Sequence, residues 1–425
     1  MKFLLVTYND TDGVGQTVIG LNSTLNKLGH ESKTILLHKS KKHDDSVILI
    51  KRSFIIRGIF FALEFLKNKL EALFSFGNST VRYGDIKNYI DESDVIIIYT
   101  LHKIISLKML EKIFNTKKIV YLRPLDMELA TGGCHVNYLD NGEECTKFQS
   151  GCDKCPKLNL LNIFNISNKI FKKKKEIIEK YKPRILLENN FTKKIYETSP
   201  ITKKAQNEIV YLTVNKNRTN LVKKRDGRKI LKLGNNDKII LFGTFNLDAP
   251  HKGGRILEDI LKRFISILRS KKTHKENSDK IKLITFGRKN SFNVNIPEIE
   301  WIHLKEIFDD QKLNLLYRSA DVFASPSTGC NAPSTVREAI INKLPVVAFD
   351  QGEAQESVID GANGYLVSCF DKEVFANSIF KVLFLNELID KDNKHEMLKS
   401  RYDPFSEAKI IIEKSSEDLK KNNFS

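Results

Sequence analysis

Short apolar runs alternate with segments of helical periodicity throughout the chain. Runs of strand length in the first half occupy Phe3–Thr7, Ser32–Leu37, Asp94–Thr100, Lys118–Leu122, Arg184–Leu187 and Glu208–Val214. Apolar residues three or four positions apart predict helices at Leu21–Leu28, which ends at Gly29, at Ser106–Phe114 and at Ile163–Tyr181. Strands that alternate with helices in this way predict an α/β fold with a parallel, Rossmann-like sheet.

The same alternation begins again after a polar stretch, Asn215–Asn236, which is typical of a linker. Predicted strands of this half are Lys238–Gly243, Lys280–Gly287, Asp321–Ala324, Pro345–Phe349 and Gly364–Val367. Predicted helices are Arg255–Leu268, Lys312–Ser319 and Thr335–Asn342. We therefore expect an N-terminal Rossmann-like domain at 1–212, a second at 213–395, and a helical segment at 396–425 that packs back on the N-terminal domain.

One segment departs from this alternation. Lys51–Phe76 mixes Ile, Leu and Phe with five Lys and Arg residues, a pattern typical of basic amphipathic helices. Two interpretations stay open: a helix that packs between parts of the protein, or a surface that lies on an anionic membrane.

The charge of the chain narrows the class of partner. Its 425 residues carry a formal net charge of +18, which favours phosphate-bearing partners or reflects a Lys-rich and Asn-rich composition. Nucleic acid is disfavoured because the basic residues are spread along the chain. Neither a secretory signal nor an apolar run of about 18–20 residues is visible. We therefore expect a cytoplasmic protein, peripheral at most on the inner face of the cell membrane.

Four of the six cysteines lie close together in the loop 126–158. Cys134, Cys145, Cys152 and Cys155 have the spacing Cys-x10-Cys-x6-Cys-x2-Cys, and Cys-x2-Cys is half of a common zinc site. A structural zinc ion is the favoured interpretation, with free thiols or disulfides as alternatives. Four thiolates close a zinc site, so this cluster is not expected to be catalytic.

The first strand-to-helix loop carries Gly13-Val14-Gly15, where missing side chains let the backbone approach a phosphate or sugar. A third glycine at the spacing of a dinucleotide fingerprint is missing. The second strand ends in Leu37-His38-Lys39, without the acidic residue that binds a NAD ribose. These departures argue against a dinucleotide enzyme.

Four segments of the second half carry a family resemblance. They are FGTFNLDAPHKGG, ADVFASPSTGCNAPSTVREAI, LPVVAFDQG and DGANGYLV, in that order. Together they resemble the nucleotide-binding domain of retaining family-4 glycosyltransferases of GT-B fold. In the first half, LRPLDMELATGGCHV and CTKFQSGCDKCPKL are similar to a cysteine-bearing subgroup associated with bacterial surface polysaccharides.

The resemblance implies two Rossmann-like domains whose parallel sheets face a central cleft. It also implies residues that bind the donor: Gly13, Gly15, Gly243, Lys252, Cys330, Thr335, Val336 and Glu338. In such enzymes the lysine at the position of Lys252 contacts the diphosphate, and the glutamate at Glu338 holds the ribose hydroxyls. Lys252, Glu338 and Asp126 are the expected catalytic residues.

Two positions depart from the family pattern. Cys330 stands where the family has the first glutamate of its Glu-x7-Glu motif, and Leu125 stands where a histidine precedes Asp126. Cysteine cannot accept hydrogen bonds as a carboxylate does, so the identity of the donor sugar is open. Arg123 and His102 are candidates for contacts with the sugar or the acceptor, and a structural role for His102 is the alternative.

The resemblance implies transfer of a sugar, with retention of configuration, from a UDP- or GDP-sugar to a saccharide or polyprenyl-linked acceptor. The pathway would be the biosynthesis of a bacterial polysaccharide: lipopolysaccharide O-antigen, capsule or exopolysaccharide. The leaving phosphate would take the acceptor proton, without a catalytic cofactor or metal. The alternative is a catalytically impaired GT-B protein that binds a sugar nucleotide or a partner subunit.

Overall fold

The structure is a computed structural model that describes residues 1–50, 77–139, 143–158, 165–214, 222–271, 280–329, 333–385, 387–388 and 394–423. It forms two compact units, residues 1–212 with 404–425 and residues 213–403. Residues 396–403, which we expected in the C-terminal segment, lie with the second unit. The basic segment Lys51–Phe76 and Cys330 lie outside the described residues.

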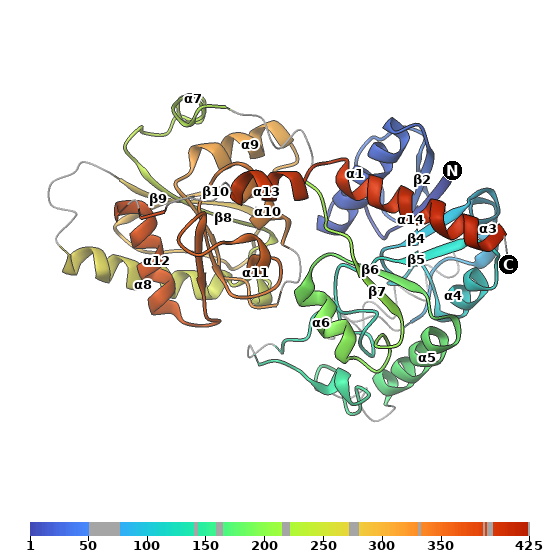
Figure 1. The fold of residues 1–425 in the computed structure, drawn as a ribbon. Helices are drawn as coiled ribbons and strands as arrows, with labels where there is room; N and C mark the ends of the chain where they lie inside the picture. Colours follow the sequence, from blue (N-terminus) through green and yellow to red (C-terminus); the bar gives the residue numbers. More distant parts are fainter. Residues whose placement is uncertain are drawn as a thin grey trace. The chain divides into compact units, whose positions relative to one another are not determined.

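The first unit is built on a seven-stranded sheet in the order β3-β2-β1-β4-β5-β6-β7, in which every neighbouring pair is parallel (Figure 1). The strands are β1 (Lys2–Val6), β2 (Glu31–Leu36), β3 (Val47–Leu49), β4 (Val95–Ile98), β5 (Ile119–Leu122), β6 (Arg184–Leu187) and β7 (Gln206–Ile209). The strand order reverses at β1, whose neighbours are β2 and β4. In such sheets ligands bind beyond the carboxyl ends of the strands at the reversal.

Consecutive residues of β1 fill two different cores. Leu4 and Val6 pack with Ile96 and Ile98, whereas Phe3 and Leu5 belong to the core on the opposite face. Because side chains alternate along a strand, a strand buried on both faces has a continuous apolar run. This explains why Phe3–Thr7 was recognisable in the sequence.

The described helices of this unit are α1 (Gly13–Lys27), α3 (Tyr83–Glu92), α4 (Leu107–Phe114), α5 (Ile166–Tyr181), α6 (Asn190–Thr198) and α14 (Ser406–Asn423). The C-terminal helix α14 crosses the first unit beside α1 and contacts β5 (Figure 1). Ala408 and Ile411 of α14 are fully buried in the core that Phe3 and Leu5 share. The chain therefore returns to its first unit through an apolar helix face.

Arg123 helps to hold α14 in place. Its side chain has no exposed surface and donates to Glu407 of α14, with Nη2 2.6 Å from Oε1, and to the Val210 carbonyl at 3.0 Å. The neighbouring negative charges outweigh burial and raise the pKa of Arg123. We expected Arg123 to contact a sugar or acceptor, but its complete burial gives it no access to a ligand in this structure. It is instead half of a buried ion pair.

The second unit has a six-stranded parallel sheet in the order β10-β9-β8-β11-β12-β13. Its strands are β8 (Lys238–Asn246), β9 (Ile281–Arg288), β10 (Ile299–Leu304), β11 (Val322–Ser325), β12 (Val346–Phe349) and β13 (Gly364–Val367). Its helices are α7 (Lys224–Ile230), α8 (Gly254–Ser270), α9 (Asp310–Ser319), α10 (Ser334–Ile341), α11 (Ala354–Ser357), α12 (Lys372–Phe380) and α13 (Lys394–Arg401), followed after α12 by a π-helical turn at Lys381–Leu385. The reversal at β8 repeats that at β1, so both units have the Rossmann-like order.

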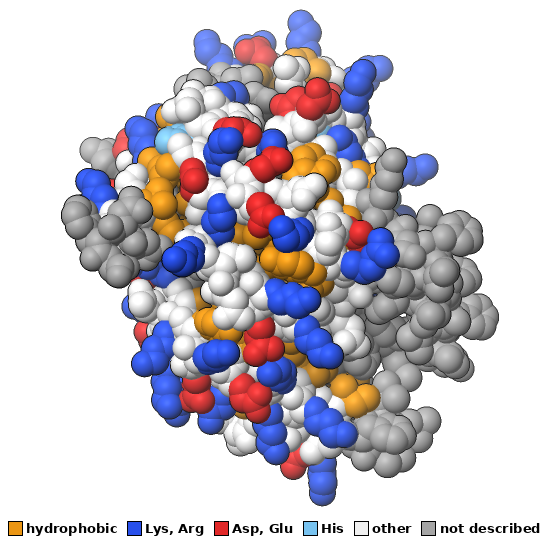
Figure 2. Space-filling view, turned by 90° about the vertical axis from the view of Figure 1, so that its right-hand side faces the viewer, with side chains coloured by type: hydrophobic (Ala, Val, Ile, Leu, Met, Phe, Trp, Pro, Cys, Tyr) orange, Lys and Arg blue, Asp and Glu red, His pale blue; other side chains and the backbone are white. Residues whose placement is uncertain are grey.

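Lys and Arg side chains are interspersed with Asp and Glu over the face in Figure 2, rather than gathered in one patch. In the part of the chain that the structure describes, none of the helices has the length and apolar character to cross a membrane.

Candidate functional site

Polar groups of the loop between β1 and α1 form hydrogen bonds with one another. Asp12 caps α1 by accepting from the Gly15 N–H at 2.7 Å, and Asn9 binds the Asp12 carboxylate at 2.6 Å. A Cβ at Gly15 would lie 2.2 Å from the Asn9 carbonyl oxygen, whereas one at Gly13 would meet nothing within 4 Å. Gly15 is therefore required by the loop itself. Its N–H, expected near a phosphate or sugar, binds Asp12 in this structure.

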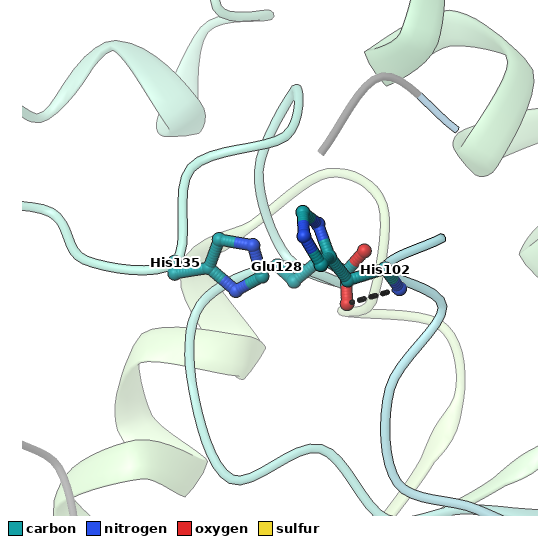
Figure 3. Close-up of side chains that lie close together, drawn as sticks. All are labelled: His102, Glu128 and His135. Carbon is teal, nitrogen blue, oxygen red and sulfur yellow. Dashed lines mark hydrogen bonds between the residues drawn. The ribbon is translucent and has the colours of Figure 1, made fainter. Parts of the chain in front are cut away.

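Beyond the carboxyl ends of β4 and β5, three side chains converge from two loops. His102 follows β4, and Glu128 and His135 belong to the loop after β5. One ligand atom from each lies within 4.8 Å of the other two (Figure 3). Among the described residues this is the one group of three or more His, Cys, Asp or Glu side chains that meets this distance. The two rings lie edge to face with centroids 5.1 Å apart.

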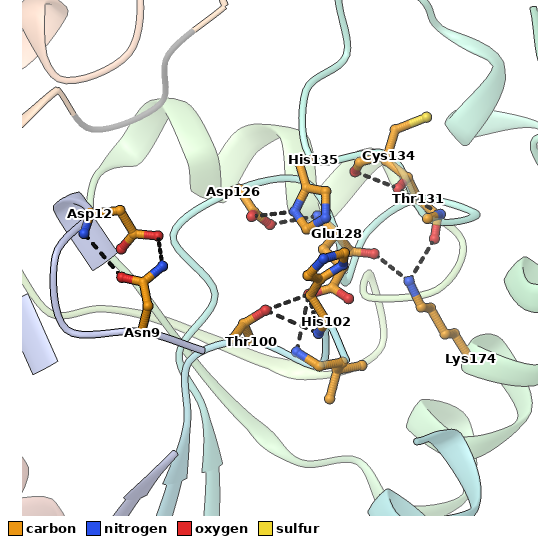
Figure 4. Close-up of polar contacts among 12 residues, drawn as sticks. Asn9, Asp12, Thr100, His102, Asp126, Glu128, Thr131, Cys134, His135 and Lys174 are labelled. Atoms are coloured by element: carbon orange, nitrogen blue, oxygen red, sulfur yellow. Dashed lines mark hydrogen bonds and ion pairs between the residues drawn. The ribbon is translucent and has the colours of Figure 1, made fainter. Parts of the chain in front are cut away.

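Asp126 binds two members of this group. Its Oδ2 lies 2.7 Å from Nδ1 of His135, and its Oδ1 accepts from the Glu128 N–H at 2.7 Å (Figure 4). Burial disfavours the protonated His135 ring, but the charges of Asp126 and Glu128 outweigh it, so the pKa of His135 is raised. The structure thus brings together two predicted residues, His102 and Asp126, with two that sequence analysis did not propose.

The carboxylate of Glu128 is fixed by its own neighbours. Oε2 accepts from Thr100 Oγ1 and from the Leu101 N–H, both at 3.0 Å. Lys174 of α5 is fully buried and donates to the carbonyl oxygens of Glu128 and Thr131 (Figure 4). Burial lowers the pKa of Lys174. In the sequence Lys174 is one of four successive lysines, 172–175. Only the spacing of the apolar residues in α5 could have predicted that Lys174, and not its neighbours, points into the core.

The four clustered cysteines line one cavity, together with Thr131, Phe148 and Lys157 among others. All four thiols are free, and a hydrogen bond between Cys134 and Cys155 lowers the pKa of Cys155 to about 6 while raising that of Cys134. Burial raises the pKa of Cys152 to about 11. No three of these thiols, all within the described residues, lie within 4.8 Å of one another, so the cluster is looser than the His102–Glu128–His135 group.

In the second unit, the loop between β8 and α8 holds Lys252 in a half-buried position just before the helix. The next residue, Gly253, has φ +77°, and a Cβ there would lie 1.9 Å from the Pro326 carbonyl oxygen. The Thr328 N–H donates to the His251 carbonyl at 3.0 Å. The loops after β8 and β11 therefore lie against each other at the carboxyl edge of this sheet.

The N-terminus of α8 differs from that of α1. Within the described part of the chain, no side chain caps it, and its N-cap is Gly253. Uncapped N–H groups and the helix dipole favour anions. Lys252, the residue before the N-cap, adds a positive charge to this loop, which makes the loop a suitable place for a diphosphate.

Other predicted donor residues have partners within the unit. Glu338 of α10 is buried, and Tyr317 donates to its Oε2 at 2.8 Å. Thr335 is half-buried at the start of α10, while the N–H of Val336, another expected donor-binding residue, donates to the Pro333 carbonyl at 3.1 Å. Gly243 lies against Phe286, whose ring a Cβ would meet at 2.1 Å, so packing alone requires this glycine.

Residues 237–384, from the start of β8 to the turn after α12, match the family model described as glycosyl transferases group 1. We call residues 237–384 the glycosyltransferase domain, after the family model that they match. No curated protein matches the chain in sequence.

Solved structures extend the likeness to both units. A sucrose-phosphate synthase from Thermosynechococcus elongatus has 14% identity and a TM-score of 0.68, covering 99% of each chain. HepE from Anabaena, solved with UDP-glucose, has 14% identity and a TM-score of 0.64, covering 98% of this chain and 100% of its own. A glycosyltransferase from Rickettsia africae has 15% identity and a TM-score of 0.61, covering 99% and 98%. The fold of the chain is the GT-B fold of glycosyltransferases.

Within the glycosyltransferase domain lie Lys252, Gly243 and Glu338, all inside the matched residues. The His102–Glu128–His135 group lies outside them, in the first unit.

Proposed function

We propose that the chain is a glycosyltransferase that moves a sugar from a nucleotide-sugar donor to a saccharide or lipid-linked saccharide, with retention of configuration, in the biosynthesis of a bacterial polysaccharide. The observation that carries the proposal is the β8–α8 loop of the glycosyltransferase domain, where Lys252 precedes a helix N-terminus without a side-chain cap among the described residues.

Departure of a nucleotide sugar's leaving group concentrates negative charge on its diphosphate. An ammonium group and helix N–H groups aimed at that charge stabilise it more in the transition state than in the bound donor. Lys252 and α8 supply these groups. In the proposed mechanism the leaving phosphate accepts the acceptor's proton, so neither a dedicated base nor a metal on the diphosphate is required.

Glu338 is proposed to bind the ribose. The Tyr317 hydroxyl donates to Oε2, and a carboxylate has further acceptor positions for two vicinal hydroxyls. The structure of HepE with UDP-glucose supports a uridine nucleotide as one donor class to examine.

The first unit is proposed to hold the acceptor. Asp12, Asp126 and Glu128 crowd the carboxyl edge of its sheet, and the charge of Asp126 contributes to raising the pKa of Asp12, after burial. Carboxylates accept hydrogen bonds from sugar hydroxyls and repel phosphate. An attachment to an anionic membrane stays a proposal that rests on Lys51–Phe76, outside the described residues.

A donor-binding screen tests the proposal. Purified protein is heated with UDP-, GDP-, ADP- and CMP-sugars, and a ligand that binds the folded state raises the melting temperature. We expect one nucleotide class to raise it, and Lys252→Ala or Glu338→Gln to abolish the rise. Lys262→Ala is the matched control, since Lys262 is an exposed lysine of α8 that pairs with Glu258.

Three outcomes are distinguishable. Donor binding with release of free nucleotide in the presence of acceptor supports the enzyme. Binding without any turnover would favour the second candidate, a GT-B protein that only binds a sugar nucleotide, which the residues Cys330 and Leu125 motivate. Absence of binding to every nucleotide sugar would contradict both.

Zinc at the four cysteines also stays a proposal, supported by the shared cavity that they line. Zinc analysis of purified protein, compared with Cys152→Ser and Cys155→Ser variants, tests it. Each variant is expected to hold one zinc per chain less than the wild type, and a zinc content unchanged in both variants would contradict the proposal.

A further inference from the structure

We propose that His102, Glu128 and His135 form a binding site for a divalent transition metal of the Zn²⁺ and Co²⁺ class. The site lies in the first unit, and its ligands include none of the four cysteines and none of the residues proposed to bind the diphosphate. It does not rest on the proposed transferase activity.

The three groups already lie at a distance from which a metal can draw them together. One ligand atom of each is within 4.8 Å of the other two, as Figure 3 shows for the grouped side chains. Two imidazoles and one carboxylate suit zinc, cobalt or iron, whereas calcium and magnesium prefer oxygen ligands alone. Three protein ligands leave at least one coordination position open for water or a ligand hydroxyl.

Neighbouring groups orient His135 and Glu128, as they do in known metal sites. Asp126 holds Nδ1 of His135 at 2.7 Å, which leaves Nε2 of the same ring for a metal. Metal-binding histidines commonly donate their other ring N–H to a carboxylate in this way, and the contact fixes the tautomer.

The carboxylate of Glu128 is also oriented by its neighbours. Thr100 and Leu101 bind its Oε2, so the carboxylate has one orientation. Buried Lys174 fixes the Glu128 carbonyl and, through it, the turn that leads to His135. The ligand loops are therefore ordered without help from a metal.

Access to the group is open on the histidine side. His102 is partly exposed and the His135 side chain is 13% exposed, whereas Glu128 is 3% exposed. A metal would thus rest on a buried carboxylate, with part of each histidine accessible to solvent. Such an arrangement admits an ion and an exchangeable ligand.

Cobalt(II) titration of metal-free protein tests the site. Nitrogen and oxygen ligands give weak visible absorption bands, while thiolate ligands add intense near-ultraviolet charge-transfer bands, so the cysteine cluster is recognised by its own signature. In the Cys152→Ser/Cys155→Ser variant we expect one Co²⁺ that has visible bands without the thiolate band, and competition by Zn²⁺. His102→Ala and His135→Ala should each weaken binding about 100-fold or more, and Asp126→Asn about 10- to 100-fold.

His43→Ala is the matched control. His43 also pairs with a carboxylate of the first unit, with Nε2 2.9 Å from Oδ2 of Asp10, but it is outside the group. Its removal should leave the cobalt bands unchanged. Circular dichroism at each step confirms that the variants fold.

Retention of the same bands in the His102→Ala/His135→Ala double variant would overturn the proposal. So would a wild-type protein that shows only thiolate-ligated cobalt, or none at millimolar Co²⁺. In those cases the three side chains are a hydrogen-bonded cluster rather than a metal site.

Discussion

The two units place a strand-to-helix loop at the same point of the same topology, yet the loops end in opposite charge. After β1, Asp12 caps α1 with a carboxylate, and the helix N-terminus is occupied by the protein's own anion. After β8, α8 starts at Gly253 without a side-chain cap among the described residues, and Lys252 stands beside it. The N-terminus of α8 in the second unit is therefore suited to an anion, whereas Asp12 already occupies the N-terminus of α1 in the first unit.

A second feature is shared rather than opposed. Asp10, after β1, accepts from the N–H groups of Ser40 and Lys41 in the loop after β2. Asp248, after β8, accepts from the N–H groups of Ser291 and Phe292 in the loop after β9. Each unit thus uses an aspartate after its first strand to fix the loop after its second. The charge contrast at the helix termini is then a difference of function on a common frame.

Removing the cation from the β8–α8 loop should have the largest effect. If Lys252 stabilises the departing diphosphate, Lys252→Ala should lower kcat by about 100- to 1,000-fold, the usual loss for one group that binds transition-state charge. Steady-state release of nucleotide measures it. Lys262→Ala should keep a kcat near that of the wild type. A Lys252→Ala enzyme with the wild-type kcat would contradict the proposed difference between the two loops.

The two aspartates should differ in their effect on stability. Asp10 is completely buried, and its backbone donors and His43 outweigh burial to lower its pKa. Asp10→Ala removes a buried carboxylate that accepts from Ser40, Lys41 and His43, and it should lower the free energy of unfolding by about 3 kcal/mol. Asp248 is half-buried, so water can replace it, and Asp248→Ala should cost about 1 kcal/mol.

The single tryptophan allows these two effects to be followed separately. Trp301 lies on β10 of the second unit and contacts Phe292, with ring centroids 5.7 Å apart. Asp248→Ala should therefore move the fluorescence transition in urea. Asp10→Ala should move the circular dichroism transition of the first unit and leave the fluorescence midpoint in place. Equal shifts of both signals in both variants would show that the units unfold as one.

The glycines of the first loop provide a finer comparison. A Cβ at Gly15 would meet the Asn9 carbonyl at 2.2 Å, so Gly15→Ala must move the backbone and should cost about 2 kcal/mol. Gly13 has open space, and Gly13→Ala should change the unfolding free energy by less than about 0.5 kcal/mol. Thermal unfolding by circular dichroism measures both. A large loss of unfolding free energy for Gly13→Ala, with none for Gly15→Ala, would contradict the roles assigned to these two glycines.

The sequence predicted the fold where burial on two faces left an unmistakable pattern. The apolar runs of β1, β4, β8 and β12 needed no further information, and both sheets are parallel as their alternation with helices predicted. It missed β10, IEWIHL, whose side chains are mostly half-exposed and whose pattern is mixed. It also placed β7 at Glu208–Val214 instead of Gln206–Ile209, because apolar Val210 and Leu212 are buried in the connection after the strand.

The candidate sites were predictable to different degrees for a related reason. Lys252 and Glu338 belong to contiguous motifs, so their place in the second unit follows from local sequence. Glu128 and His135 reach His102 only because parallel strands β4 and β5 end at one edge of a sheet. No local pattern marks such a meeting. The role of Arg123 could not be predicted from local sequence either, because its partner Glu407 is 284 residues away.

Replacing Asp12 by asparagine should have the smallest effect and tests the charge contrast most directly. Asparagine caps helices as well as aspartate does, so Asp12→Asn should change stability by only a few tenths of a kcal/mol at a pH near 4. Burial, with a contribution from Asp126, raises the pKa of Asp12 above its unfolded value of 3.8. The folded state therefore disfavours the ionised form, and wild-type stability should fall relative to Asp12→Asn as pH rises through that raised pKa. Urea unfolding across this range measures the slope. Nucleotide-sugar affinity should be the same in both proteins, because the proposed anion site belongs to α8. Tighter binding in Asp12→Asn would mean that α1 can also receive a phosphate and that its own aspartate is what keeps it out.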